Sequence, residues 1–205
     1  MYKTEQEQFW AGEFGTNYIV RNNNAKIIAG NLNLFSKIIG KTIGVRSVIE
    51  FGSNIGLNLR AIKSLIPDCE LSAIEINTDA IEILKEQDVT IYAKSILDFI
   101  PDYQRDLSFT KGVLIHINPE VLSDVYKKLY ESTRKYILIT EYYNPSPVAI
   151  KYRGHDDRLF KRDFAGEIME MYADLKLVDY GFSYHKDNNY AQDDLNWFLL
   201  EKNQY

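Results

Sequence analysis

Short apolar runs that end in turn residues alternate with amphipathic stretches along most of the chain. The apolar runs have the length of buried strands, and the amphipathic stretches have the period of helices. The expected strands are 47–51, 70–76, 89–93, 107–113, 136–141, 175–182 and 196–201. The expected helices are 25–39, 57–65, 77–86, 119–132 and 161–172. Strands that alternate with helices predict a mainly parallel sheet that is covered on both faces.

These elements predict one α/β domain that spans residues 1–205, because this length buries one core well and is short for two. The last two strands are joined without a helix, which predicts a hairpin and an antiparallel edge strand in an otherwise parallel, seven-stranded sheet. Residues 1–45 are interpreted as an N-terminal helical cap, with three asparagines at 22–24 available to cap the helix 25–39. Residues 142–160 form a long irregular stretch, which is typical of a substrate or lid loop.

Composition and charge argue against nucleic-acid and membrane partners. The chain is 45% hydrophobic with a net charge of −5, whereas proteins that bind duplex nucleic acid usually carry a basic excess. No apolar run approaches the roughly 18–20 residues that cross a bilayer, so no membrane partner is expected. The start of the chain is polar and acidic, unlike a signal peptide, and Cys69 is the single cysteine. These features favour a cytoplasmic protein that acts on a small molecule or a protein; they leave the oligomeric state open.

The stretch SVIEFGSNIG, from Ser47 to Gly56, carries the strongest local signal. A strand, a glycine turn and a helix hold a nucleotide-like cofactor over backbone amides at the helix N-terminus. Gly52 can adopt backbone angles that are closed to other residues, and Gly56 permits a close approach of the cofactor. A dinucleotide fingerprint reads G-x-G-x-x-G, whereas here an acid, Glu50, precedes the first glycine by two residues. The stretch resembles motif I of the class I S-adenosylmethionine (SAM) methyltransferases; an ordinary strand-to-helix turn is the alternative.

Glu75 and Ser95 follow at the ends of the next two expected strands. An acid at the position of Glu75 can accept hydrogen bonds from both ribose hydroxyls of an adenosyl group; a solvent-facing acid is the alternative. In SAM methyltransferases the next strand ends in a polar residue for the adenine amine, beside an apolar residue for the ring. Ser95 and Ile96 hold these places, although a turn serine beside a core isoleucine would look the same.

Lys111 and His116 lie near the end of the fourth expected strand, where a doubly wound sheet opens its crevice. Lys111 is expected beside the methionine moiety of the cofactor. His116 is the candidate catalytic base, because an imidazole titrates near neutrality and can deprotonate a methyl acceptor. The alternative is a histidine that caps the next helix or supports the pocket wall.

A locally basic segment lies in and just after the irregular stretch. Its cations could bind a carboxylate or a phosphate of the acceptor, and a charged surface loop is the alternative. The substrate-binding candidates are Tyr142, Arg153, His155 and Arg158. The three histidines of the chain show no metal-ligand spacing, so no metal is expected.

Longer motifs carry a more specific resemblance. They are TEQEQFWAGEFGTNYIVRN at the start, VIEFGSNIGLNL, GVLIHINPE, EYYNPSPVAIKYRGHDDRLFKRDFAGEIM, and LVDYGFSYHKD with QDDLNWFLLEK in the tail. Together they span nearly the whole chain and resemble the pseudaminic-acid-biosynthesis-associated methylases. That family is assigned as SAM-dependent methylases and associated with nonulosonic acids, the nine-carbon acidic sugars of bacterial surfaces.

The resemblance implies a three-layer, Rossmann-like class I methyltransferase fold with SAM as cofactor. It implies an acceptor that is a small molecule, an acidic or nucleotide-linked amino sugar of pseudaminic-acid-type surface glycan synthesis. The implied SAM contacts are Glu50, Gly52, Asn54, Gly56, Glu75, Ser95 and Ile96, with Phe9, Trp10, Gly15 and Tyr18 closing over the cofactor.

Three other readings remain open. An NAD-dependent oxidoreductase shares the fold outline but would carry a third glycine in the fingerprint. A methyltransferase for a protein, peptide or nucleic acid would carry N/D-P-P-aromatic after the fourth strand, where this chain has Asn118-Pro119-Glu120. A non-catalytic SAM-binding protein would keep Glu75 and the glycines yet show no turnover.

Overall fold

The computed structural model describes residues 2–203, apart from the side chains of residues 155–157. A seven-stranded sheet has the strand order β3-β2-β1-β4-β5-β9-β8. The strands β1 to β5 are parallel, and β9 runs antiparallel between β5 and β8. The bounds are β1 Ser47–Phe51, β2 Glu70–Glu75, β3 Thr90–Ala93, β4 Arg105–Lys111, β5 Thr133–Glu141, β8 Leu175–Phe182 and β9 Asn196–Lys202. The predicted fold class is confirmed.

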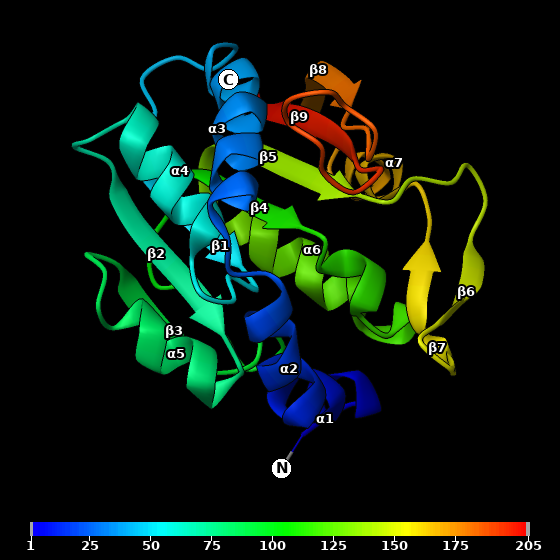
Figure 1. Cartoon of the computed structure of the whole chain (residues 1–205). Helices are drawn as coiled ribbons and strands as arrows, with labels where there is room; N and C mark the ends of the chain where they lie inside the picture. The colour runs from blue at the N-terminus through cyan, green and yellow to red at the C-terminus, as the bar shows by residue number, and fades with distance from the viewer. Residues whose placement is uncertain (1, 204–205) are drawn as a thin grey trace.

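Helices cover both faces of the sheet and the end toward which the parallel strands point (Figure 1). The bounds are α1 Glu5–Ala11, α2 Glu13–Arg21, α3 Ala25–Ile39, α4 Leu57–Leu65, α5 Thr78–Leu84, α6 Leu122–Glu131 and α7 Phe164–Met171, with short 3₁₀ turns at Leu114–His116 and Pro119–Val121. In Figure 1, α1 and α2 lie beyond the tip of the β2 arrow, apart from the helices on the faces.

Two apolar cores lie on the two faces of the sheet. Helices α3 and α4 pack on one face, where Phe35 and Ile62 belong to the same core as Val48 of β1. Helices α6 and α7 pack on the other face, in the core that contains Ile49 of β1. Every residue of β1 is buried, as a strand covered on both sides requires.

The connections create a crevice at the carboxyl end of the sheet. The chain proceeds from β1 outward to β2 and β3, and then returns to place β4 on the other side of β1. Adjacent crossovers therefore leave β1 and β4 in opposite directions, and ligands bind at such a switch point in open α/β sheets.

The irregular stretch expected at 142–160 is the main error in the sequence prediction. The strands β6 (Val148–Tyr152) and β7 (His155–Lys161) form a separate antiparallel hairpin there, which stands off the sheet in Figure 1. Its two turn residues, Arg153 and Gly154, have φ values of 49° and 93°, as tight hairpin turns require. The following helix begins at Phe164, because Asp163 caps it by accepting a hydrogen bond from the Gly166 N–H at 2.8 Å.

Candidate functional site

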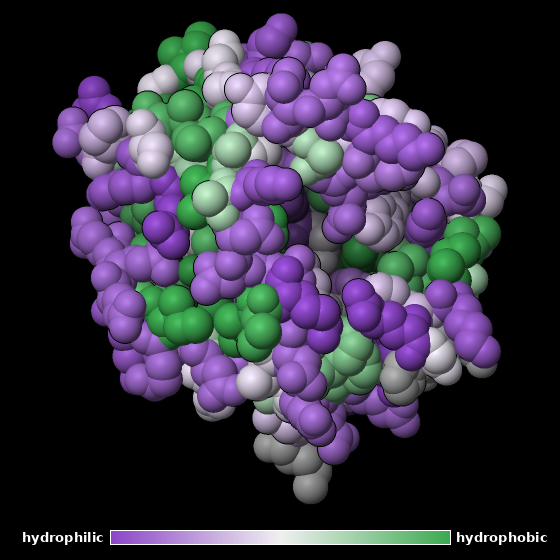
Figure 2. All heavy atoms as spheres, in the orientation of Figure 1, coloured by the Kyte–Doolittle hydropathy of each residue, from purple (hydrophilic) through white to green (hydrophobic). Residues whose placement is uncertain are grey.

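A cavity of about 500 Å³ lies at the carboxyl ends of β1, β2 and β4. Its other walls come from α1, α2, the start of α3 and the loop between β8 and β9. Figure 2 shows the surface hollowed near its centre, with mostly hydrophilic side chains around the hollow. The predicted cofactor residues that line the cavity are Trp10, Gly15, Tyr18, Gly52, Asn54, Glu75, Ser95, Ile96 and Lys111. Three other residues predicted to contact the cofactor, Phe9, Glu50 and Gly56, are not among the described residues that line the cavity.

Both glycines of the turn have a left-handed backbone, which the sequence predicted for Gly52. Gly52 has a φ of 76°, and a Cβ there would lie 2.8 Å from the side chain of Val113. Gly56 has a φ of 75° and would collide in the same way with Leu84. Gly52 therefore shapes the cavity wall, whereas Gly56 lets helix α4 begin against its neighbours.

Glu75 is hydrogen-bonded to the backbone of the glycine turn. Its carboxylate accepts hydrogen bonds from the backbone N–H groups of Asn54 at 2.6 Å, Ile76 at 2.8 Å and Asn77 at 2.8 Å. Burial raises the pKa of Glu75, and these three donors oppose that rise. The contacts fix the carboxylate at the cavity wall, where it leaves room for a further donor.

Glu50 lies one layer behind the wall. It is fully buried, and its Oε1 accepts a hydrogen bond of 2.6 Å from Asn58, which does line the cavity. Burial raises the pKa of Glu50 to about 8. Burial lowers the pKa of Lys111, and the nearby carboxylates of Glu50, Asp193 and Glu141 oppose that change. The predicted acid of motif I is therefore protonated at neutral pH in the ligand-free chain, and its contact with the cavity wall runs through Asn58.

Ser95 is engaged with the N-terminal helix. Its hydroxyl donates to the carboxylate of Glu7, and its oxygen accepts from the Leu97 N–H at 2.9 Å. Glu7 also lines the cavity. No local sequence pattern predicts this contact, because 88 positions separate the two residues.

His116 lines the cavity from within an aromatic cluster. Its ring centroid lies 4.7 Å from that of Trp10 and 5.1 Å from that of Tyr152 in β6. Its Nδ1 lies 2.5 Å from the carbonyl oxygen of Arg158. Because a carbonyl oxygen only accepts, Nδ1 carries the proton and Nε2 keeps a lone pair. Burial lowers the pKa of His116 to about 4, so the ring is neutral at pH 7.

Of the predicted substrate residues, the three with described side chains, Tyr142, Arg153 and Arg158, lie outside the cavity lining. Arg158 donates to Glu5 at 3.0 Å, which joins β7 to α1. Arg153 occupies the hairpin turn, where its guanidinium lies 5.8 Å from the ring of Tyr152. Burial raises the pKa of Tyr142, as does the nearby carboxylate of Asp193. The side chain of His155 lies outside the described residues.

The loop between β8 and β9 supplies a wall that the sequence did not predict. It brings His185, Gln192 and Asp193 to the cavity. Gln192 donates a hydrogen bond of 3.2 Å to Asn31 of α3, and its side chain occupies the space that a Cβ on Gly30 would need. The loop is thus held against α3 by residues about 160 positions away in sequence.

No model of a protein family matches the chain, and a comparison with curated proteins finds no match by sequence. Solved structures do resemble it. The plantazolicin methyltransferase BpumL, in complex with a pentazolic desmethylPZN analog and SAH, is 15% identical with a TM-score of 0.66, over 97% of this chain and 95% of that one. Burkholderia thailandensis 1,6-didemethyltoxoflavin-N1-methyltransferase, with bound 1,6-didemethyltoxoflavin and S-adenosylhomocysteine (SAH), is 13% identical with a TM-score of 0.68, over 97% of this chain and 87% of that one.

A third similar structure is the glycopeptide N-methyltransferase MtfA complexed with SAM, at 10% identity and a TM-score of 0.63, over 85% of this chain and 94% of that one. At such low sequence identity, the structural likeness shows a shared fold and nothing more. The chain therefore has the class I SAM-dependent methyltransferase fold. None of the helices within the described residues is long and apolar enough to cross a membrane.

Proposed function

We propose that this chain is a SAM-dependent methyltransferase that acts on a small molecule. The observation that carries the proposal is the direct bond between Glu75 and the glycine turn, at the wall of a cavity on the switch point of the sheet. The likeness to structures crystallised with SAH or SAM supports the same cofactor.

The polar groups at the cavity fit this cofactor. Within the described residues, Trp10 Nε1, Ser53 Oγ and Asn54 Oδ1 are buried without a hydrogen-bond partner, and all three residues line the cavity. Buried polar groups are normally paired, so unpaired ones around a cavity indicate a polar ligand. Glu75 would hold the ribose hydroxyls, and the apolar side chain of Ile96 would lie against the base.

The chain supplies alignment, charge and a proton acceptor for methyl transfer. SAM provides a methyl group on a sulfonium, whose positive charge is dispersed as the bond to sulfur breaks. Helices α1 and α2 and the β8–β9 loop form walls of the cavity that can hold two substrates in a fixed orientation, which favours a reaction that depends on positioning. His116 is neutral at pH 7 with a lone pair on Nε2, so it can take a proton from an amine or alcohol acceptor. Its lowered pKa makes it a weaker base than the imidazole titrating near neutrality that the sequence predicted.

For the acceptor, we propose an acidic or nucleotide-linked amino sugar of pseudaminic-acid-type glycan synthesis. The sequence motifs that resemble the associated methylases support this assignment. Arg153 and Arg158 lie outside the cavity lining and would meet anionic parts of the acceptor that project from the cavity.

A peptide amine is the second candidate acceptor. Asp193 lines the cavity on the side of the β8–β9 loop, where a carboxylate would hold a cationic amine. Two of the similar structures are named as N-methyltransferases, one of them for a glycopeptide. This support comes by analogy of fold and is weaker than a residue match.

Calorimetric titration with SAM, SAH and NAD tests the cofactor. We expect SAM and SAH to bind and NAD to give no heat. Binding of NAD alone would overturn the proposal in favour of an oxidoreductase. Mass spectrometry of products from nonulosonic acids, nucleotide amino sugars and short peptides would then identify the acceptor and the methylated atom.

His116→Ala tests the proton acceptor. For an amine or alcohol acceptor, we expect turnover to fall about 10²-fold or more, because general bases contribute on that scale. SAH affinity should change little. His116→Phe keeps a ring between Trp10 and Tyr152 and serves as the packing control, with the same loss of turnover expected. A near-normal rate in His116→Phe would reduce His116 to a wall residue.

A further inference from the structure

The N-terminal segment is fastened to the loop that follows β3. Lys3 Nζ donates a hydrogen bond of 3.1 Å to the Leu97 carbonyl and lies 2.7 Å from the Asp98 carboxylate. Ser95 donates to Glu7 in the first turn of α1. These contacts place an acid from the start of the chain over the end of β3, at the rim of the cavity.

Glu7 is held more tightly than a helix cap needs. It forms a capping box with Thr4, in which Glu7 Oε2 accepts from the backbone N–H groups of Lys3 and Thr4. A capping-box glutamate can serve that role from the surface of a helix, yet Glu7 is only 8% exposed and lines the cavity. Three donors occupy three of the roughly four lone-pair positions of the carboxylate, which leaves one.

The two ends of the cavity differ in chemistry. Beside β3 the wall contains the apolar side chains of Ile74, Ile96 and Leu97, which suit a flat base. On the side of β4 and the β8–β9 loop it contains Lys111 and Asp193, which suit a charged amino-acid group. An adenosyl cofactor with its ribose at Glu75 would therefore extend its base toward β3.

The acids among the described lining residues are Glu7, Glu75 and Asp193. Glu75 is the ribose candidate and already accepts three backbone N–H groups, and Asp193 belongs to the opposite side. Glu7 is the acid left at the base end. We propose that Glu7 accepts a hydrogen bond from the exocyclic amine of the bound adenine, so that helix α1 makes the site selective for adenine over a 6-oxopurine.

This inference rests on the proposed function, because it needs an adenosyl cofactor in the cavity. In this arrangement Ser95 is a positioning residue: its hydroxyl donates to Glu7 and orients the carboxylate. A 6-oxopurine would present a carbonyl oxygen to that carboxylate, and two acceptors cannot bond to each other. A site built around a hydrogen bond rejects the analogue that lacks it.

Glu7→Gln should change this preference in a defined direction. The capping box also accepts glutamine, provided that an oxygen faces the backbone N–H groups of Lys3 and Thr4. The amide nitrogen then faces Ser95 and the cavity, where it presents a donor instead of an acceptor. Such a donor disfavours the amine of adenine and favours the 6-oxo group of hypoxanthine.

The test is calorimetric titration of the full chain with SAH and with S-inosyl-homocysteine, its 6-oxopurine analogue. We expect the unchanged chain to bind SAH at least about tenfold more tightly, the scale of one hydrogen bond to a charged group. In Glu7→Gln we expect SAH affinity to fall by about tenfold and the preference to disappear or reverse. Glu5→Gln is the matched control on the same helix, since the Glu5 side chain is 76% exposed; it should keep the preference.

Each outcome has one meaning. If the unchanged chain binds neither ligand, the proposed function fails. If it binds both equally, or if Glu7→Gln weakens both equally while its thermal unfolding without ligand is unchanged, the role of Glu7 is overturned and the cofactor assignment stands. Should Glu7→Gln fold poorly, Ser95→Ala reports on the same contact, with a reduced preference for SAH expected and an unchanged preference counting against the proposal.

Discussion

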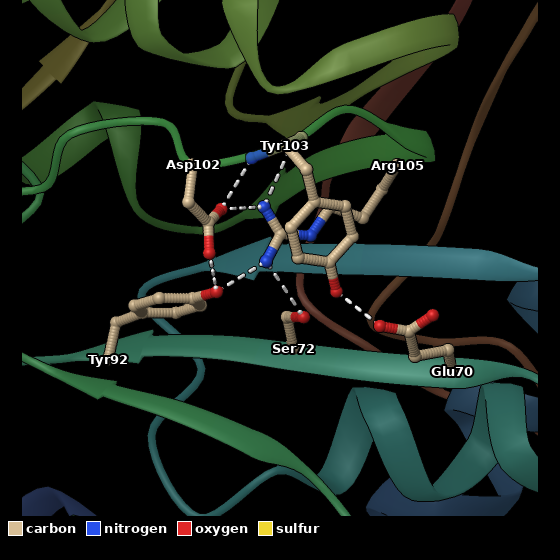
Figure 3. Close-up of polar contacts among 6 residues, drawn as sticks. All are labelled: Glu70, Ser72, Tyr92, Asp102, Tyr103 and Arg105. Carbon is tan, nitrogen blue, oxygen red and sulfur yellow. Dashed lines mark hydrogen bonds and ion pairs between the residues drawn. The ribbon is translucent and has the colours of Figure 1, made fainter.

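Two buried groups of charged residues, at opposite ends of β4, differ in how fully their polar atoms are hydrogen-bonded. The guanidinium of Arg105, at the start of β4, is fully buried and is surrounded by protein acceptors (Figure 3). It donates to Asp102 at 2.5 Å, to the Tyr103 carbonyl at 2.8 Å, to Tyr92 at 2.6 Å and to Ser72 at 3.3 Å. Of its nitrogens, only Nε lacks a partner among the described residues.

Near the other end of β4, several buried polar atoms have no hydrogen-bond partner among the described residues. Within the described part of the chain, Glu50 Oε2 has no hydrogen-bond partner, and neither do the cavity groups Trp10 Nε1 and Asn54 Oδ1. A closed network stabilises the fold, whereas buried groups without partners cost stability unless a ligand supplies them. The difference indicates that the amino-terminal end of β4 serves the fold and that its carboxyl-terminal end serves binding.

The largest expected effect is at the closed network. Arg105→Ala should lower the free energy of unfolding by about 3 kcal/mol or more, because it removes a buried cation and leaves its acceptors unpaired. Urea unfolding measures this loss. Arg134→Ala is the control: Arg134 pairs with Asp106 but is 52% exposed, so it should cost less. An equal loss in both variants would contradict the comparison.

At the open end of β4, ionisation of the buried Glu50 should lower the stability of the ligand-free protein. Burial raises the pKa of Glu50 from 4.5 to about 8, so the folded chain retains a proton that the unfolded chain releases between these values. Stability of the ligand-free protein therefore falls as the pH rises from about 4.5 to about 8. At pH 8.5 we expect Glu50→Gln to raise the free energy of unfolding by roughly 2–4 kcal/mol.

Asp106 provides the matched control for Glu50. Burial alone would raise the pKa of Asp106, but Arg134 and backbone donors outweigh burial and hold it below its usual value. Asp106→Asn should therefore destabilise the protein at neutral pH. A destabilised Glu50→Gln at pH 8.5 would show that Glu50 is ionised and satisfied without ligand.

A smaller effect is expected in cofactor binding. Glu75→Ala should weaken SAH by about 1.5–3 kcal/mol, through lost hydrogen bonds to a charged acceptor. Glu70→Ala is the control, because Glu70 begins the same strand and bonds to Tyr103 on the closed side (Figure 3). Calorimetry should show a loss for Glu75 alone; unchanged SAH affinity in Glu75→Ala would remove it from the cofactor site.

The smallest effect is expected away from both groups. Arg153 holds a φ of 49° in the hairpin turn, an angle that asparagine tolerates better than arginine. Arg153→Asn should raise the free energy of unfolding by less than about 1 kcal/mol and leave SAH affinity unchanged. A large loss of SAH affinity would show that the hairpin turn reaches the cofactor.

The sheet was predictable because its signals are local. Buried strands such as β1 and β4 are recognised in the sequence as apolar runs. In SVIEFGSNIG the first glycine directly follows the apolar run of β1, which indicates that a turn begins there. Gly52, Glu75 and Lys111 could be assigned to one cavity because the carboxyl ends of neighbouring parallel strands meet at one edge.

The remaining parts of the site depend on contacts between distant segments. Glu7 reaches Ser95 and Gln192 reaches Asn31 only after the fold has formed, and neither pair has a sequence pattern. The hairpin was missed because Pro145 and Pro147 precede β6 and a charged run occupies much of β7, and both features are typical of loops in a sequence. The position of Glu50 behind the wall could not be inferred, since spacing alone does not say which way a strand side chain points.

The insertion of β9 between β5 and β8 has a consequence for how the protein is made. A ribosome releases β5 long before β9, so the flank of β5 that β9 later covers stays open while about fifty residues are added. The loop that carries Asp193 emerges just ahead of β9, so the cavity wall that it supplies is held in place only after β9 has paired with β5. A nascent chain stalled before β9 would present an uncovered strand to chaperones and would have no finished pocket.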